Sequence, residues 1–287
     1  MRKKSMNDTM AVFGRGVLQY APKVILWIVM VLYTSACARP PEGMVAVPAG
    51  EFIMGTDEQD LQEKATEYGI MKPWFNDEHP AHRVNLPLYY IDTYETTNAE
   101  YRTFAQNTGR KLPPDWSNGQ YPAAKARHPV IHVRWEDANA YCLWAGKRLP
   151  TEAEWEKAAR GTDGLKYPWG DAFDETRANV NGQVGNTTEI GQYEKGGSPY
   201  GSYDMTGNVW EWTADWYQPY PGNPYASDKF GEKVKVLRGN SWAGLGHFPP
   251  KIHNEVKAHY SRAGYRLFMS PAGLVNDVGF RCAKSSG

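Results

Sequence analysis

Three histidines close together in the C-terminal part of the chain could bind a metal ion. His247, His253 and His259 lie within residues 243–261, and Glu255 lies among them. Imidazole nitrogens and carboxylate oxygens are ligands for zinc, iron and copper. Spacings of six residues, however, do not place side chains on one helix face, where neighbours are three or four residues apart. We therefore expect a solvated loop or lid, and we keep a metal or catalytic role of the histidines as the alternative.

Cysteine chemistry is restricted to three positions. Cys37 follows an N-terminal hydrophobic run, and only Cys142 and Cys282 lie in the part of the chain that we expect to fold. Export would permit a disulfide between them, and two buried free thiols are the alternative. A bridge would close a loop of about 140 residues and stabilise the fold by roughly 4–5 kcal/mol in the chain-entropy model.

Residues 1–37 have the pattern of an export signal. Basic residues precede an apolar run, residues 24–33, and small residues then lead to Cys37. The run is too short for a transmembrane helix, which needs about 20 residues. The small residues resemble a bacterial lipobox, whose cysteine is acylated and becomes the new N-terminus, although Thr34 stands where a lipobox usually has leucine. We predict lipidation at Cys37, with an uncleaved anchor and a soluble secreted form as alternatives.

The same pattern predicts where the protein resides. Residues 38–43 would form a short tether ahead of a domain over residues 44–287. Ala38, rather than aspartate, follows the cysteine, which implies sorting to the outer membrane in a cell with two membranes. We therefore expect an exported protein of the periplasm or cell envelope, anchored to the membrane by lipid.

Composition favours one domain and gives no sign of a nucleic-acid partner. The chain has 287 residues, with 28 Gly, 20 Pro and 11 Trp, which suits a domain with many turns and few long regular elements. About 250 residues remain after the signal, enough for one sizeable core. The formal net charge is zero, and we see no basic stripe of the kind that binds nucleic acid.

Regular elements are expected at a few places. Capping boxes beginning at Thr97 and Thr151 predict two helices. The first is expected to end at Gly109 and the second at Gly161. An apolar face predicts a third helix over residues 135–145. Short β-rich segments predict strands at residues 50–55, 83–92, 234–238 and 279–283.

Two long blocks resemble the sulfatase-modifying-factor family, whose best-known members are formylglycine-generating enzymes. They are residues 201–216 (GSYDMTGNVWEWTADW) and residues 141–156 (YCLWAGKRLPTEAEWE). Shorter blocks match in order at residues 47–55, 94–101, 167–170, 237–242 and 278–282. The resemblance implies a single-domain α+β fold, the sulfatase-modifying-factor fold, which has little regular secondary structure and is related to C-type lectins.

One part of the family pattern is missing. Formylglycine-generating enzymes bind copper through two cysteines, and a thiolate pair suits Cu(I) because ligand and metal are both soft. The corresponding segment here, residues 243–261, has no cysteine, whereas the match resumes at residues 262–266. We therefore expect no copper site and no copper-dependent oxidation of a substrate cysteine.

The resemblance implies two structural features. The family counterparts of Cys142 and Cys282 are bridged in some members, so we favour the disulfide. The stretch 207–211 forms a structural calcium site in the related enzymes, and calcium needs six to eight oxygen ligands. The implied ligands are Thr206, Gly207, Asn208, Val209 and Glu211, with Asn179 and Val180 in a weaker second site. The alternative is that Asn208 and Glu211 satisfy buried backbone amides.

Three functions are consistent with these patterns. The favoured one is a non-catalytic accessory or scaffold subunit, which associates with or matures a membrane or periplasmic redox enzyme complex. The family includes many cysteine-lacking members, some of them accessory factors of exported enzymes. The alternatives are an oxidase with an altered, non-thiolate site and a lectin-like ligand-binding protein. We expect calcium as a structural ion, and we expect no copper. The expected partners are a protein and, through the lipid anchor, the membrane, but not a nucleic acid.

Overall fold

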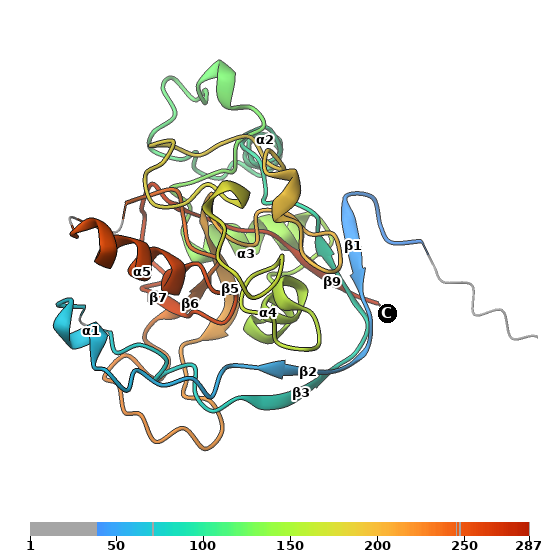
Figure 1. Cartoon of the computed structure of the whole chain (residues 1–287). Helices are drawn as coiled ribbons and strands as arrows, with labels where there is room; N and C mark the ends of the chain where they lie inside the picture. The colour runs from blue at the N-terminus through green and yellow to red at the C-terminus, as the bar shows by residue number, and fades with distance from the viewer. Residues whose placement is uncertain (1–38, 71, 245, 247, 287) are drawn as a thin grey trace, which may run out of the picture. The chain divides into compact units, whose positions relative to one another are not determined.

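The computed structural model describes residues 39–286 except 71, 245 and 247. Residues 39–287 form one unit, and Figure 1 labels most of its helices and strands. The export signal with Cys37, and the histidine at position 247, fall outside the described residues. No helix in the described part is long and apolar enough to cross a membrane.

Short strands form three small sheets among the described residues. The first has the order β1-β4-β9, with β1 Met44–Val47, β4 Tyr89–Asp92 and β9 Ala283–Ser285. The second is the antiparallel pair of β2 Gly50–Met54 and β3 His82–Leu86. The third has the order β7-β6-β5-β8, with β7 Leu267–Met269, β6 Lys235–Arg238, β5 Trp210–Trp216 and β8 Val278–Gly279.

Two of the expected strands are each divided between sheets. Residues 83–92 contribute to β3 and β4, which pair with different partners. Pro87 lies between them, and a proline cannot donate to a strand ladder. Residues 279–283 likewise contribute to β8 and β9, and the chain between these two strands is fully buried at Arg281. Periodicity alone did not reveal either division.

The helices agree well with the capping signals. α2 (Asn98–Thr108) and α4 (Glu152–Arg160) begin at complete capping boxes and end at Gly109 and Gly161, both with positive φ. α3 covers Trp135–Trp144. Two further helices are α1 (Lys64–Glu67) and α5 (Pro250–Tyr260), and short 3-10 helices cover Ala123–Lys125, Glu175–Arg177 and Glu194–Gly196.

The predicted disulfide is confirmed. Cys142 of α3 is bonded to Cys282, with sulfurs 1.98 Å apart, and both residues are fully buried. Around the bridge, Tyr141 packs edge to face against Phe104 and Phe280. Because the bridge joins α3 to the chain just before β9, it ties the last strand to the aromatic core.

α4 has two buried faces of opposite character. Trp155, Ala158 and Ala159 pack into an apolar cluster with Tyr89. Glu152, Glu156 and Arg160 recur every four residues and are also buried, so they share the other face of the helix. The helix packs against β2, β5 and β6, and it therefore brings carboxylates into the middle of the domain.

Candidate functional site

The segment in place of the copper-binding cysteines folds as a helix. Residues 250–260 form α5, which begins with Pro250 at its first position, where a proline is well tolerated. Val256 is buried with Ala65 and Trp74 in a separate apolar cluster. This corrects the expectation of a solvated loop or lid. The physical reason is that the segment has an apolar partner in residues 57–76, which lie far away in the sequence.

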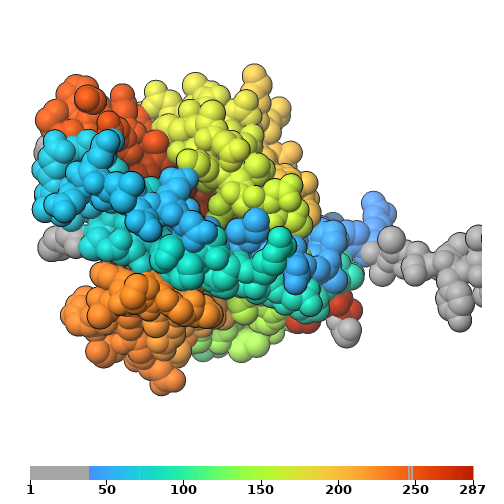
Figure 2. Space-filling model, turned by 60° about the horizontal axis from the view of Figure 1, so that its bottom comes forward, coloured from blue at the N-terminus to red at the C-terminus, as the bar shows by residue number. Residues whose placement is uncertain are grey.

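α1 and α5 are also joined by polar contacts. Glu255 accepts hydrogen bonds from the ammonium of Lys64 at 2.9 Å and from the hydroxyl of Tyr68 at 2.8 Å. These contacts lower the pKa of Glu255 and raise that of Tyr68 to about 12. In Figure 2, the cyan residues that include α1 lie next to the orange-red residues of α5. The Glu255 carboxylate therefore links α5 to α1. We call these two contacting helices the α1–α5 cover.

His259 lies inside the cover and is only 5% exposed. Its ring stacks on Trp74 with centroids 4.3 Å apart and meets Phe75 edge to face at 4.8 Å. Nε2 lies 3.2 Å from the Arg262 guanidinium, which can only donate, so Nε2 is the acceptor. Burial, together with Arg262 and Lys72, holds the pKa of His259 well below its usual value. The imidazole is therefore neutral and structural.

The histidines do not form a metal site in the described part of the chain. His253 is half-buried on α5, whereas His259 is enclosed by aromatic rings. Among residues 39–286, apart from the three positions not described, no group of three His, Cys, Asp or Glu side chains is arranged to hold a metal. The described residues thus give His253 and His259 no three-ligand metal arrangement, and His247 lies outside the description.

Glu211, the expected calcium ligand, is paired with an arginine. Its carboxylate accepts hydrogen bonds from Arg281 at 2.7 and 2.8 Å and from the indole of Trp155 at 2.8 Å. Glu211 and Arg281 are both fully buried. The negative charge expected to attract calcium is thus already matched by a guanidinium. Arg281 approaches from 70 residues further along the chain, and the calcium role of the Glu211 side chain stays a prediction.

The two stretches expected to form separate calcium sites lie against each other. A Cβ atom on Gly207 would come within 2.5 Å of the carbonyl oxygen of Asn179 and 2.9 Å of Val180, so this contact requires glycine. Asn208 Oδ1 accepts from the amide of Thr188 at 2.9 Å, as the hydrogen-bonding alternative predicted.

The remaining expected ligands of this region are buried too. The Thr206 hydroxyl donates to Ser261 at 3.1 Å, and Val209 is fully buried. Asn179 Oδ1 is buried and has no hydrogen-bond partner among the described residues, and it is an oxygen that could meet a cation. Of the expected ligands, Asn179 would therefore offer calcium this amide oxygen, and the others would offer backbone carbonyls.

The sequence analysis did not single out two buried carboxyl groups beside this region, those of Glu95 and Asp204. Glu95 accepts a hydrogen bond from Asn208 at 3.3 Å, and Asp204 accepts one from the amide of Gly191 at 2.6 Å. Burial raises the pKa of Asp204 to about 6 and that of Glu95 well above its usual value. Both residues stand inside matched blocks, but only their burial distinguishes them from surface acids.

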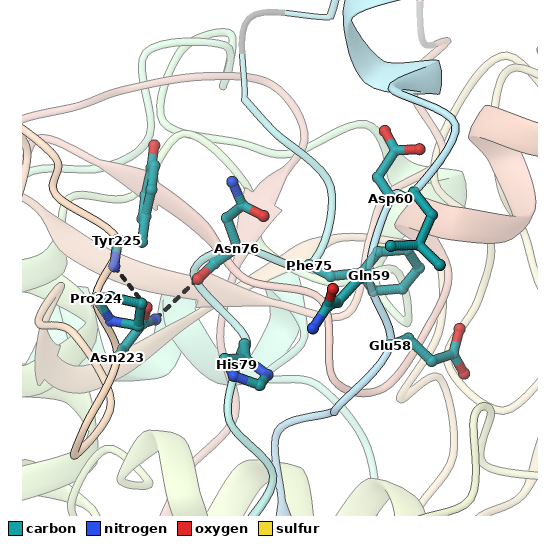
Figure 3. A pocket seen from close by; sticks show the side chains of 10 residues that line it. Glu58, Gln59, Asp60, Phe75, Asn76, His79, Asn223, Pro224 and Tyr225 are labelled. Carbon is teal, nitrogen blue, oxygen red and sulfur yellow. Dashed lines mark hydrogen bonds between the residues drawn. The ribbon is translucent and has the colours of Figure 1, made fainter.

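A groove opens next to the α1–α5 cover. It has a volume of about 400 Å³, and Figure 3 shows the 223–225 loop on one side and residues 58–60 on the other. Phe75 and Tyr225 provide aromatic surface, and Asn223 donates to the carbonyl of Asn76 at 2.8 Å. The groove combines amides, carboxylates and rings, and His79, whose Nδ1 lies 3.4 Å from Asp57 Oδ1, also lines it.

Comparisons with known proteins identify the family of the domain. The family pattern described as sulfatase-modifying factor enzyme 1-like domain matches residues 31–286. The mouse inactive C-alpha-formylglycine-generating enzyme 2 is 31% identical, covering 93% of both chains. Hercynine oxygenase of Mycolicibacterium smegmatis is 32% identical over 73% of this chain and 56% of that protein. The structure of PvdO from Pseudomonas aeruginosa superimposes with a TM-score of 0.60 at 29% identity, covering 84% and 93% of the two chains.

The buried, neutral His259 predicts a pH-dependent stability. Its folded pKa is lowered, so below about pH 6.5 the unfolded chain binds a proton that the folded protein does not. The free energy of unfolding should therefore decrease as the pH is lowered below about 6.5, with this residue contributing up to about 1.4 kcal/mol per pH unit. We expect His259→Phe, which keeps an aromatic ring against Trp74, to flatten this dependence between pH 7 and pH 5 in urea unfolding.

His253→Phe on the same helix is the matched control and should leave the dependence unchanged. Equal slopes for the native protein and for His259→Phe would contradict a neutral, buried His259.

Proposed function

The chain belongs to the sulfatase-modifying factor enzyme 1-like family, and we propose that it is a non-catalytic member acting as an accessory or scaffold subunit. In this proposal the exported domain is tethered to the membrane at Cys37 and associates with, or helps to mature, a membrane or periplasmic redox enzyme complex. The proposal is carried by one observation. Where formylglycine-generating enzymes have their copper-binding cysteines, this chain forms α5, which contains the buried, neutral His259.

The contacts of α5 support a structural use of this segment. Its carboxylate Glu255 binds α1, and its imidazole His259 packs on Trp74. Neither group is left to activate oxygen or a substrate. The likeness to a protein named as an inactive formylglycine-generating enzyme, along nearly the whole of both chains, favours the same conclusion. The groove lined by Phe75 and Tyr225 offers a surface for a partner.

An oxidase with a different site is the second candidate. The similarity to hercynine oxygenase favours it, because a family relative with that name carries out another oxidation. Such an enzyme would need a metal or another oxidant held by residues other than the described histidines. Metal analysis of the protein purified from its native membrane distinguishes the two, since stoichiometric iron or copper would support the oxidase.

The proposal predicts no formylglycine synthesis. Without a cysteine between Ser241 and Arg262, the chain has no soft thiolate pair for Cu(I) in that segment. A Cys-x-Pro-x-Arg peptide incubated with the protein, copper, oxygen and a reductant should remain unoxidised by mass spectrometry. A formylglycine-generating enzyme assayed in parallel should convert the peptide. An aldehyde product from this protein, at a rate above that of copper alone, would rule out the non-catalytic assignment.

Membrane tethering at Cys37 predicts a clear fractionation result. In cells labelled with an alkynyl fatty acid, the full chain should acquire label and sediment with membranes. Cys37→Ser should lose the label and either stay unprocessed or become soluble. Ser35→Ala, which keeps a small residue in the lipobox, is the control and should behave like the native chain. A mature protein that still starts at Met1 would refute lipidation.

We propose calcium as a structural ion held near Asn179 and the backbone of residues 206–209. Binding to the folded state alone raises its stability by about 2.7 kcal/mol at 100-fold excess over Kd. A chelator should therefore lower the melting temperature, and Asn179→Ala should remove most of this response. Glu211→Gln should lower the melting temperature with or without calcium, because it breaks the pair with Arg281. Melting that is indifferent to calcium would show that hydrogen bonds alone hold this region.

A further inference from the structure

Two adjacent apolar side chains are exposed at the C-terminal end of α3. Leu143 is 62% exposed and Trp144 is 43% exposed, and they are the last two residues of the helix. We call them the Leu143–Trp144 patch. Single exposed apolar residues are common on protein surfaces and need no explanation. This pair differs from that background because of its position relative to the chain that enters the domain.

The chain enters the domain next to this end of α3. The carbonyl of Gly43, just before β1, accepts from the amide of Thr93 at 2.9 Å, which holds the entering chain in place. Glu42 and Gly43 border a small cavity that Tyr141 of α3 also lines. The rings of Tyr141 and Trp144 have centroids 5.9 Å apart. Trp144 thus lies beside a residue that faces the entering chain across this cavity.

Contacts with the first sheet fix the position of the helix end. Lys147 Nζ lies 2.6 Å from Oδ1 of Asp92, the last residue of β4. Arg148 and Ala283 of β9 exchange backbone hydrogen bonds of 2.7 and 2.9 Å. β1, which follows Gly43, pairs with β4 in the same sheet, and Figure 1 shows β1 and β9 on the same side of the domain. The end of α3 is therefore joined to the sheet in which the domain begins.

The proposed anchor at Cys37 would keep this surface close to the bilayer. Only residues 38–43 separate Cys37 from the start of β1, and six residues span at most about 20 Å when fully extended. Surfaces near Gly43 are therefore confined to the neighbourhood of the lipid. Such confinement acts as a high effective concentration, so that a weak affinity of the patch for lipid is sufficient for contact.

The charges beside the patch permit contact with neutral lipid. Lys147 and Arg148, the basic residues that follow the helix, are each paired with a carboxylate at 2.6 Å, and paired charges are the form in which ionisable residues enter a membrane environment. Glu42 and Glu100, which line the cavity, are acidic and do not attract anionic lipid. The favourable contribution is therefore apolar contact rather than charge.

We propose that the end of α3 lies on the membrane, with Leu143 and Trp144 inserted among the lipid headgroups. This inference rests on the proposed lipid anchor at Cys37 and adds which face of the domain meets the bilayer. Tryptophan favours the membrane–water interface, because its ring is apolar and its N–H is polar, and leucine adds apolar area that leaves water. Two side chains do not anchor a domain by themselves, so the patch orients a domain that the lipid already holds.

This orientation leaves the partner surface free. In Figure 1, α1 and α5 are on the left, whereas β1 and β9 are on the right. The groove beside the α1–α5 cover lies near α1, away from the sheet that the chain enters. With the Leu143–Trp144 patch on the lipid, the groove stays accessible to a protein partner.

The test uses the lipidated full chain in phosphatidylcholine vesicles that carry bromine on the acyl chains near the headgroups, where bromine quenches tryptophan fluorescence. The native protein should lose part of its emission in brominated vesicles relative to plain ones. Trp144→Phe, which keeps an aromatic ring against Phe104, should lack this quenched component, and the difference identifies Trp144 as its source. Raised salt should leave the quenching unchanged, because screening weakens charge attraction and not apolar contact.

Leu143→Glu tests the patch and keeps the reporter ring. The added charge should at least halve the quenched component, whereas the melting temperature should stay unchanged because Leu143 is exposed. Leu274→Glu is the matched control. Leu274 is also an exposed leucine beside an exposed apolar residue, Val275, but its loop contacts Trp135 at the other end of α3. This variant should be quenched like the native protein.

The outcomes separate this inference from the anchor. Every variant should acquire the fatty-acid label and sediment with membranes, because Cys37 is unchanged. A labelled, sedimenting native protein without quenching of Trp144 refutes the patch alone, and a chain that acquires no label refutes the anchor and this inference with it. Loss of a co-purifying protein in Leu143→Glu, with quenching as in the native protein, overturns the inference by assigning the patch to a protein partner.

Discussion

A network of buried charges on α4 holds together segments that have little regular structure of their own. The guanidinium of Arg238 on β6 contacts both Glu152 and Glu156, and Arg266 binds Glu152 through two nitrogens. Arg238 and Glu156 are completely buried. Removing one partner would leave an uncompensated charge in the core, which typically costs about 3–5 kcal/mol. The main effect of the network is therefore to fix the positions of α4, β6 and the segment that carries Arg266, because each buried charge requires its partners in place.

The same network explains how loops can form a stable domain. Glu156 also accepts from the amide of Gly55 at 2.8 Å, and Arg266 donates to the carbonyl of Asp77 at 2.7 Å. Backbone groups of irregular segments are thereby satisfied by core side chains rather than by strand ladders. A nearby pair of the same kind, Arg262 with Glu78, is bidentate at 2.8 Å. Long-range ion pairs thus hold irregular segments together in this domain, as strand ladders do in more regular folds.

This arrangement separates the framework from the site. The buried pairs lie on α4, β6 and the 262–266 segment, whereas the segment that carries the copper cysteines in formylglycine-generating enzymes lies between β6 and Arg262. That segment is a helix here, packed on α1 through Val256 and Glu255, and it meets the buried pairs where His259 accepts from Arg262. The proposed non-catalytic role is compatible with this separation, because the members of the buried ion pairs lie outside residues 243–261.

The sequence by itself determined the features that depend on neighbouring residues. The capping boxes at Thr97 and Thr151 specify where α2 and α4 begin, because a capping box closes within four residues. The matched blocks determined the domain, and the absence of cysteine in 243–261 determined the loss of the thiolate pair. Only the tertiary structure decided the rest. Arg281 reaches Glu211 across 70 residues, and Glu255 reaches Lys64 across 191. Which acid is neutralised depends on such contacts, and no local spacing records them.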